Sequence, residues 1–291
     1  MKAVTILKEI VSIPSTSGDE KSIQAYIKNL MEKSKISYLN QGENVIVHFK
    51  GKNRNKAIIF NGHVDTVEPG QISNWKYDPY NPTEINEKIY GLGVSDMKGS
   101  IACMIKLALQ LSTETPNCDV WFAFVVKEEL DGSGTKDFIS WFINQGYKDK
   151  YVEIVAIIGE PTGLNEIEIG HRGNAFVQCT TTGQTGHGSR PEEIKKHAIL
   201  EMNNLIISSV EKLSRRWTKL FVNEFLGVPT IALTGIRAGS KRSPNKFSEI
   251  CNAYFDIRTT PELHQKLDLY TQQLPFFLYL YCFSHSLFLA C

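Results

Sequence analysis

Two side chains with metal-binding chemistry follow a short apolar run near the start of the chain. Residues 57–60 (AIIF) have the pattern of a buried strand, and His63 and Asp65 come shortly after it. In an extended chain, residues two apart point to the same side. A histidine can bind a metal through one ring nitrogen while a carboxylate accepts a hydrogen bond from the other. A purely structural pairing of the histidine with its neighbouring aspartate fits this stretch equally well.

Four further acidic residues, at three places in the sequence, also follow apolar runs in loops that contain Gly or Pro. They are Asp96, the adjacent pair Glu128 and Glu129, and Glu160. Open parallel sheets gather the carboxyl ends of their strands at one edge, where ligands bind. Carboxylates crowded there repel one another unless a cation neutralises them, and His with Asp or Glu is a common zinc ligand set. We therefore expect a metal site, with one of the paired glutamates free to act as a general base.

The elements that would position these side chains alternate between strand and helix. Strand patterns occur at residues 45–49, 57–60, 120–126 and 154–158, and helical patterns at residues 2–12, 19–35, 98–112 and 134–146. Nearly continuous apolar strands of this kind are typical of a mostly parallel sheet covered by helices. The pattern predicts an α/β domain over residues 1–172.

The pattern changes after Arg172. Strands are predicted at residues 174–184, 229–239 and 249–258, with helices at residues 192–214 and 260–274. This spacing predicts a second, α+β domain over residues 173–274. The last stretch, residues 275–291, contains no Asp, Glu, Lys or Arg, whereas 22% of the whole chain is charged. It is short for a membrane-spanning helix, which needs about 20 apolar residues.

Composition excludes several classes of function. The 291 residues carry a formal net charge of +1, so no overall attraction to nucleic acid or to an anionic membrane is expected. The six cysteines form no C-x-x-C pair, which argues against a disulfide scaffold and a cysteine zinc site. Lys8 and Glu9 interrupt the apolar N-terminal residues, so these do not form a signal peptide, and we expect a cytoplasmic protein.

Several motifs taken together resemble the M20 metallopeptidase family. They are NGHVDTVEPG, YGLGVSDMKGS, KEELDGSGT, IIGEPTG and IGHRG, followed by GQTGHGSRPEE and SPNKFSEICNAYFDIR. Their order and spacing match the family as far as about Leu274. The resemblance implies a mostly parallel-sheet zinc-hydrolase catalytic domain with an inserted α+β lid and dimerisation domain. It also implies a homodimer formed through that lid.

The resemblance implies two zinc ions in each catalytic site, with Co²⁺ or Mn²⁺ as substitutes. His63 would bind one ion, Asp65 would orient His63, and Asp96 would bridge both ions. Glu129 would bind the second ion, and Glu160 would complete the site of the first.

Further roles follow from the same resemblance. Glu128 would be the general base, and His187 in the lid would polarise the substrate carbonyl, reaching across the dimer. Asn245 and Arg258 would bind the substrate carboxylate, for which the planar fork of arginine is well suited. A cis peptide bond is implied between Asp96 and Met97.

The implied activity is hydrolysis of the amide bond of N-acyl amino acids, as in the desuccinylases and deacetylases of the family. Cleavage of short peptides by a carboxypeptidase or dipeptidase is one alternative. In the family, a segment after the lid supplies a further metal-binding histidine, and His285 lacks the acidic neighbour and preceding strand of that pattern. A second alternative is therefore an impaired product with a truncated or out-of-frame end at residues 275–291, weak binding of the second metal and a tendency to aggregate.

Overall fold

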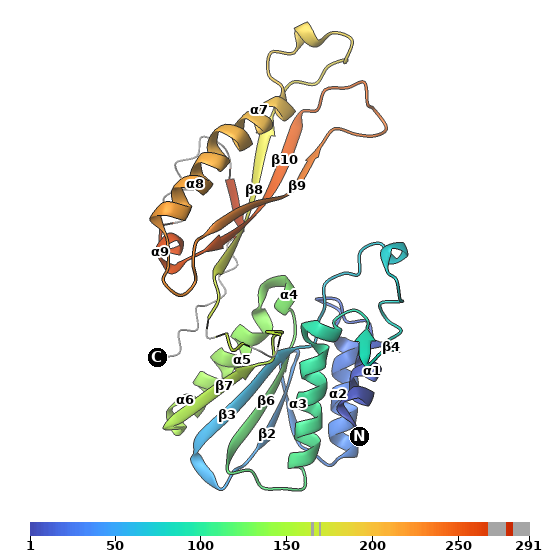
Figure 1. Ribbon diagram of the computed structural model, residues 1–291, viewed down its shortest axis with the longest axis vertical. Helices are drawn as coiled ribbons and strands as arrows, with labels where there is room; N and C mark the ends of the chain where they lie inside the picture. Colours follow the sequence, from blue (N-terminus) through green and yellow to red (C-terminus); the bar gives the residue numbers. More distant parts are fainter. Residues whose placement is uncertain (164–165, 169, 267–277, 282–291) are drawn as a thin grey trace. The chain divides into compact units, whose positions relative to one another are not determined.

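The computed structural model describes residues 1–163, 166–168, 170–266 and 278–281 (Figure 1). The chain separates into two compact units, Met1–Ile167 and Glu168–Cys291. Each unit has its own sheet and its own buried core. The apolar stretch at residues 275–291 lies outside the described residues, except for residues 278–281. Among the helices that are described, none is long and apolar enough to cross a membrane.

The first unit is built on a five-stranded sheet with the order β1-β2-β6-β3-β7. β3 runs parallel to both β6 and β7, whereas β2 is antiparallel to β6 and to β1. These strands are β1 (Tyr38–Gln41), β2 (Asn44–Phe49), β3 (Asn53–His63), β6 (Cys118–Val125) and β7 (Glu153–Ile158). The predicted α/β class is confirmed, and the parallel pairs join the three strands that precede the predicted site residues.

Alternating side chains of this sheet enter two apolar cores, one on each face. Val45 and Phe122 pack against the helices α1, α2 and α3, whereas Ile46 and Trp121 pack against α5. Successive strand residues point to opposite faces, so a strand with helices on both sides is apolar throughout. The helices are α1 (Ala3–Val11), α2 (Lys21–Lys33), α3 (Gly99–Leu111), α4 (Glu128–Asp131), α5 (Ser133–Asn144) and α6 (Tyr147–Lys150). A small separate hairpin consists of β4 (Thr83–Ile85) and β5 (Lys88–Tyr90).

The second unit contains an antiparallel sheet with the order β11-β8-β10-β9. Its core joins strand residues such as Val177 and Phe255 to helix residues such as Met202 and Trp217. The strands are β8 (Gly173–Thr182), β9 (Thr230–Ala238), β10 (Ile250–Thr259) and β11 (Leu278–Tyr281). The helices are α7 (Ala198–Leu205), α8 (Glu211–Leu220) and α9 (Pro261–His264), with a π-helical turn Ile206–Val210 between α7 and α8.

The long helix predicted at residues 192–214 starts and ends later in the structure. Pro191–Glu193 form only a short 3₁₀ turn, and the amide N–H of Gln184 then donates to the carbonyl of Lys196 at 2.8 Å, which holds Lys196 outside a helix. His197 then caps α7, because its ring nitrogen accepts from the amide of Leu200 at 3.4 Å. The helical stretch therefore begins at Ala198 and runs to Leu220. The sequence predicts the helix too early because its helical pattern does not reveal the hydrogen bond between Gln184 and Lys196.

Candidate metal centre

Three parallel strands direct the candidate ligands to one edge of the first unit's sheet. β3 ends at His63, β6 is followed by Glu128 and Glu129, and β7 is followed by Glu160. The carboxyl ends of neighbouring parallel strands meet at the same edge. Because β3 lies between β6 and β7, His63 occupies the middle of this edge, with acidic groups on either side.

Asp96 reaches the site from a different kind of element. The sequence placed it near a strand end, but it lies at a kink in the segment Val94–Lys98, directly before α3. Its backbone is extended, with φ −122° and ψ 103°, and its carboxylate contacts His63. The peptide bond between Asp96 and Met97 is cis, as the resemblance implied.

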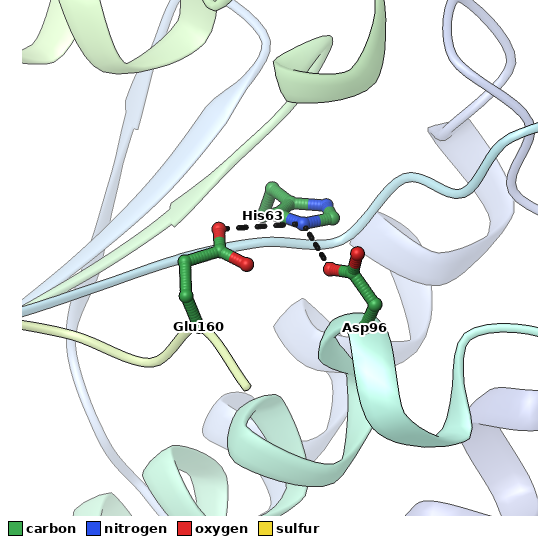
Figure 2. Close-up of side chains that lie close together, drawn as sticks. All are labelled: His63, Asp96 and Glu160. Carbon is green, nitrogen blue, oxygen red and sulfur yellow. Dashed lines mark hydrogen bonds and ion pairs between the residues drawn. The ribbon is translucent and has the colours of Figure 1, made fainter. Parts of the chain in front are cut away.

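His63, Asp96 and Glu160 form a first group of possible metal ligands (Figure 2). The Nε2 atom of His63 lies 3.1 Å from Oδ1 of Asp96 and 3.6 Å from Oε1 of Glu160. The imidazole is 1% exposed, whereas both carboxylates are open to solvent on their outer side. Figure 2 shows the two carboxylates pointing at the same ring nitrogen from different segments.

His63, Glu128 and Glu129 form a second group, with candidate ligand atoms within 4.8 Å of one another. Oε2 of Glu128 lies 4.0 Å from Nε2 of His63. Both glutamates belong to the first turn of the short helix α4, which follows β6. Both can therefore approach the same imidazole, and the division of roles between base and ligand stays a prediction.

Asp65 is fully buried and joins the two segments that carry these groups. Its Oδ1 accepts from the amide of Glu128 and its Oδ2 from the amide of Glu129, both at 3.1 Å. The backbone carbonyl of Asp65 lies 3.0 Å from Nδ1 of His63. A proton held at Nδ1 leaves Nε2 free to bind a metal, which is the tautomer that a metal ligand of this type requires.

Ser17 is a site residue that the sequence did not reveal. Its hydroxyl donates to Oδ2 of Asp65 at 2.6 Å. Ser17 belongs to the motif PSTSG, residues 14–18, between the helical patterns predicted at residues 2–12 and 19–35. The two serines and one threonine of this motif could have indicated such a hydrogen bond, since short hydroxyl side chains in turns often bond to nearby polar groups.

The charges of the site favour a bound cation. Burial lowers the pKa of His63, but hydrogen bonds with Asp65 and Asp96 outweigh it and raise this pKa to about 11. Burial raises the pKa of Glu160 to about 7, and burial together with the charge of Asp96 raises the pKa of Glu129. Carboxylates that hinder one another's ionisation are stabilised by a divalent ion. One imidazole with several carboxylates is also a donor set that suits zinc, so the residues fit the implied metal.

The three predicted lid residues fall into two places in the second unit. Nδ2 of Asn245 lies 3.1 Å from Nε2 of His187, and the Gly188 amide donates to the Asn245 carbonyl at 2.7 Å. Arg258 lies near the far end of β10, where it donates to Asp256 at 2.9 Å. The structure thus brings His187 and Asn245 together, whereas Arg258 lies near the carboxyl end of β10, the strand that begins five residues after Asn245.

Residues 59–267 match the model of the family described as Peptidase family M20/M25/M40. The chain belongs to this family. The match begins in β3 and includes every residue predicted for the site from His63 to Arg258. The resemblance inferred from the motifs is therefore confirmed.

Curated relatives of this M20 chain include two bacterial enzymes. It is 30% identical over 259 residues to acetylornithine deacetylase of Buchnera aphidicola subsp. Schizaphis graminum, a match covering 88% of this chain and 62% of the relative. It is 28% identical over 269 residues to succinyl-diaminopimelate desuccinylase of Orientia tsutsugamushi strain Boryong, covering 88% of this chain and 66% of the relative. The chain thus spans a little under two thirds of the length of these relatives.

Solved structures with the same fold include two peptidases. The M20 family metallo-carboxypeptidase Sso-CP2 from Sulfolobus solfataricus has a TM-score of 0.74 at 19% identity, covering 96% of this chain and 78% of that one. Human carnosine dipeptidase 1 has a TM-score of 0.63 at 15% identity, covering 97% of this chain and 77% of that one. At this level of identity, the similarity establishes the fold alone.

Proposed function

We propose that this M20 chain is a metal-dependent amidohydrolase that removes the acyl group from N-acyl amino acids. The observation that carries the proposal is the convergence of two ligand groups on His63 at the carboxyl edge of the sheet. The names of the curated relatives, a deacetylase and a desuccinylase, support an N-acylated amino acid as substrate. Zinc is the proposed metal, with Co²⁺ or Mn²⁺ as substitutes.

The two ligand groups suggest how the metal would be held. His63 and Glu160 would bind one ion, Glu129 would bind a second, and Asp96 would bridge them. When bound, zinc supplies a Lewis acid that polarises the substrate carbonyl and lowers the pKa of a water molecule. Asp65 would keep the ring of His63 in the required tautomer, because its own position is fixed by bonds from Glu128 and Glu129.

Glu128 is proposed as the general acid and base of the reaction. Its carboxylate would take a proton from the attacking water, whose oxygen bonds to the carbonyl carbon of the substrate. It would then pass that proton to the amide nitrogen as the carbon–nitrogen bond breaks. The products are the free amino acid and the carboxylate of the acyl group. The 4.0 Å between Oε2 of Glu128 and Nε2 of His63 supports this proposed role.

The second unit is proposed as a lid and dimerisation domain over residues 173–274, following a catalytic domain at residues 1–172. His187 would polarise the substrate carbonyl of the partner subunit in a homodimer. Its bond to Asn245 supports a joint role for these two residues. Arg258 would bind the substrate carboxylate through paired N–H groups. We further propose a cytoplasmic protein that binds neither nucleic acid nor membranes.

A combined measurement of metal content and substrate range tests this function. The purified chain is dialysed against zinc, its metal is counted by mass spectrometry, and turnover is compared for N-acetyl and N-succinyl amino acids and for dipeptides. We expect bound zinc, loss of turnover with a chelator, and preference for an acylated amino acid. His63→Ala is the control for specific metal binding. Preference for dipeptides would favour the peptidase alternative, and one ion with little turnover would favour the impaired product. Absence of both metal and turnover would contradict the proposal.

A further inference from the structure

The segment that follows β6 is held by side chains through four consecutive amide groups. Residues 126–129 each donate their backbone N–H to a side-chain oxygen. The donors and acceptors are Val126 to Asn44 (3.2 Å), Lys127 to Glu20 (3.1 Å), Glu128 to Asp65 Oδ1 (3.1 Å) and Glu129 to Asp65 Oδ2 (3.1 Å). The acceptors come from three separate parts of the first unit. Two of them, Glu20 and Asn44, have no role in the site as described so far.

These side chains supply partners for amides that have none in the sheet. At the edge of a sheet, the ladder of backbone hydrogen bonds stops, and later amides need another backbone group, a side chain or water as acceptor. Here the ladder ends where the amide of Val64 donates to the carbonyl of Val125 at 2.9 Å. Hydrogen bonds to the three acceptor side chains then fix the path of the backbone through the next four residues. Those residues include both glutamates of the candidate metal centre.

Glu20 is the acceptor that is best placed to fix this direction. It is 3% exposed and lies immediately before α2. Its Oε1 accepts from the amide of Gly18 at 2.8 Å as well as from Lys127, so its own turn holds the carboxylate in place. Lys127 has φ 58° and ψ 31°, a left-handed conformation that residues other than glycine adopt only when their surroundings impose it.

The turn that contains Glu20 also contacts the segment after β3. The hydroxyl of Ser15 donates to the carbonyl of Val64 at 2.8 Å, and the amide of Thr66 donates to the carbonyl of Ser15 at 2.9 Å. Ser17 bonds to Asp65 at 2.6 Å. Residues 15–20 therefore link the segment that carries His63 to the segment that carries Glu128 and Glu129.

We propose that Glu20 is a positioning residue for the metal centre. It accepts from the amide of Lys127, stabilises the left-handed backbone there, and so sets the directions in which the carboxylates of Glu128 and Glu129 point. Glu20 itself touches neither metal nor substrate. The inference rests on the proposed function insofar as Glu128 and Glu129 are taken as base and metal ligand.

Two substitutions at Glu20 distinguish loss of the hydrogen-bond acceptor from loss of the negative charge. Glu20→Gln keeps an acceptor oxygen at the same position, whereas Glu20→Met keeps a similar volume without a comparable acceptor. Tyr151→Phe is the control for general destabilisation, because its hydroxyl bonds to Asp119 near the amino end of β6, away from the metal centre. For each variant, Co²⁺ and Zn²⁺ affinities are measured by titration. Amide hydrogen exchange of peptides covering residues 126–131 is measured without metal.

We expect Glu20→Met to weaken metal binding by about 10- to 100-fold, as for other residues that orient ligands without touching the ion. Exchange at residues 126–131 should be about 10-fold faster, which corresponds to loss of one hydrogen bond. Glu20→Gln should stay close to the original protein in both measurements. Tyr151→Phe should lower the melting temperature without changing either.

Three results would overturn the proposal. These are unchanged exchange at residues 126–131 in Glu20→Met, an equal effect of Tyr151→Phe on that segment, or failure of Glu20→Gln to restore slow exchange. If the unaltered chain binds neither Co²⁺ nor Zn²⁺, the proposed function fails. The exchange measurements, made without metal, then still decide whether Glu20 positions the segment.

Discussion

The carboxylate of Asp65 accepts a hydrogen bond from the amide of Glu128 at 3.1 Å, although 62 residues separate the two in the chain. A single buried side chain thereby joins the carboxyl end of β3 to the first turn of α4. Because the same aspartate also contacts His63, a disturbance at Asp65 should be felt on both sides of the metal centre.

Asp65→Asn should weaken metal binding by about 10- to 100-fold while the first unit stays folded. The asparagine offers one acceptor oxygen in place of two, and its NH₂ group would face the amide of Glu128 or Glu129. Titration with Co²⁺, followed by visible absorption, measures the loss. Ser17→Ala removes only one donor to Asp65 and should give a smaller loss in the same direction. Equal metal affinity in Asp65→Asn and the original protein would rule out this role.

Glu128→Ala and Asp96→Ala should separate the base from the bridging ligand. We expect Glu128→Ala to retain its metal and to lose turnover by about 10²- to 10⁴-fold, because a general base moves protons without holding the ion. Asp96→Ala should lose metal as well as turnover. Metal counting on both proteins, combined with an N-acyl amino acid assay, makes the distinction. If Glu128→Ala lost its metal and Asp96→Ala kept it, the two assignments would be reversed.

Asp119→Asn should make the stability of the protein less dependent on pH in acid. Burial alone would raise the pKa of Asp119, but hydrogen bonds from the amide of Gly51 and the hydroxyl of Tyr151 hold it well below its usual range. Arg54 lies 2.8 Å from the same carboxylate. Since the pKa is depressed in the folded state, this stabilisation is complete above about pH 4 and is lost as the pH falls towards the folded-state pKa.

Urea unfolding between pH 3 and pH 7 tests this dependence on Asp119. Below about pH 4, the slope of the unfolding free energy against pH should be smaller in Asp119→Asn by up to about 1.4 kcal/mol per pH unit, the effect of one proton. At pH 7 the variant should be less stable by about 3–5 kcal/mol, because several donors lose a buried charged partner. Equal acid slopes in the two proteins would show that Asp119 is not held ionised by the fold.

Gly134→Ala should destabilise the first unit by about 1–3 kcal/mol, because the added methyl group overfills a close contact. A Cβ atom at this position would lie 2.2 Å from the carbonyl oxygen of Val126 and 2.7 Å from its nitrogen. Neither backbone atom can move without shifting the segment that leads to Glu128. Chemical unfolding measures the change, and Ser140→Ala on the exposed side of α5 is the matched control, expected within about 0.5 kcal/mol. Equal stability of the two variants would contradict the close approach.

Much of the fold and of the candidate site could be predicted because the relevant information is local. The apolar runs of β2, β3 and β6 indicated strands covered on both faces, and the helical spacing of α1, α2, α3 and α5 was equally clear. The run of β7 also indicated a strand, but β7 lies at the edge of the sheet and its side chains Val155, Ile157 and Ile158 are exposed, so its predicted burial was wrong. His63 and Glu160 stand directly after such runs, so the parallel arrangement alone was enough to predict that they meet.

Other features depended on contacts between distant residues and could not be predicted. Nothing in the sequence around Asp96 shows that a turn before α3, and not a strand end, delivers its carboxylate. Nothing around Glu128 shows that it begins a helix whose first two amides are held by Asp65, directly after an amide held by Glu20. A hydrogen bond needs a donor and an acceptor within about 3 Å, and only the folded chain brings groups so far apart in sequence to that distance. The sequence therefore determined which residues have the chemistry of a metal centre, and the tertiary structure decided how they are aimed.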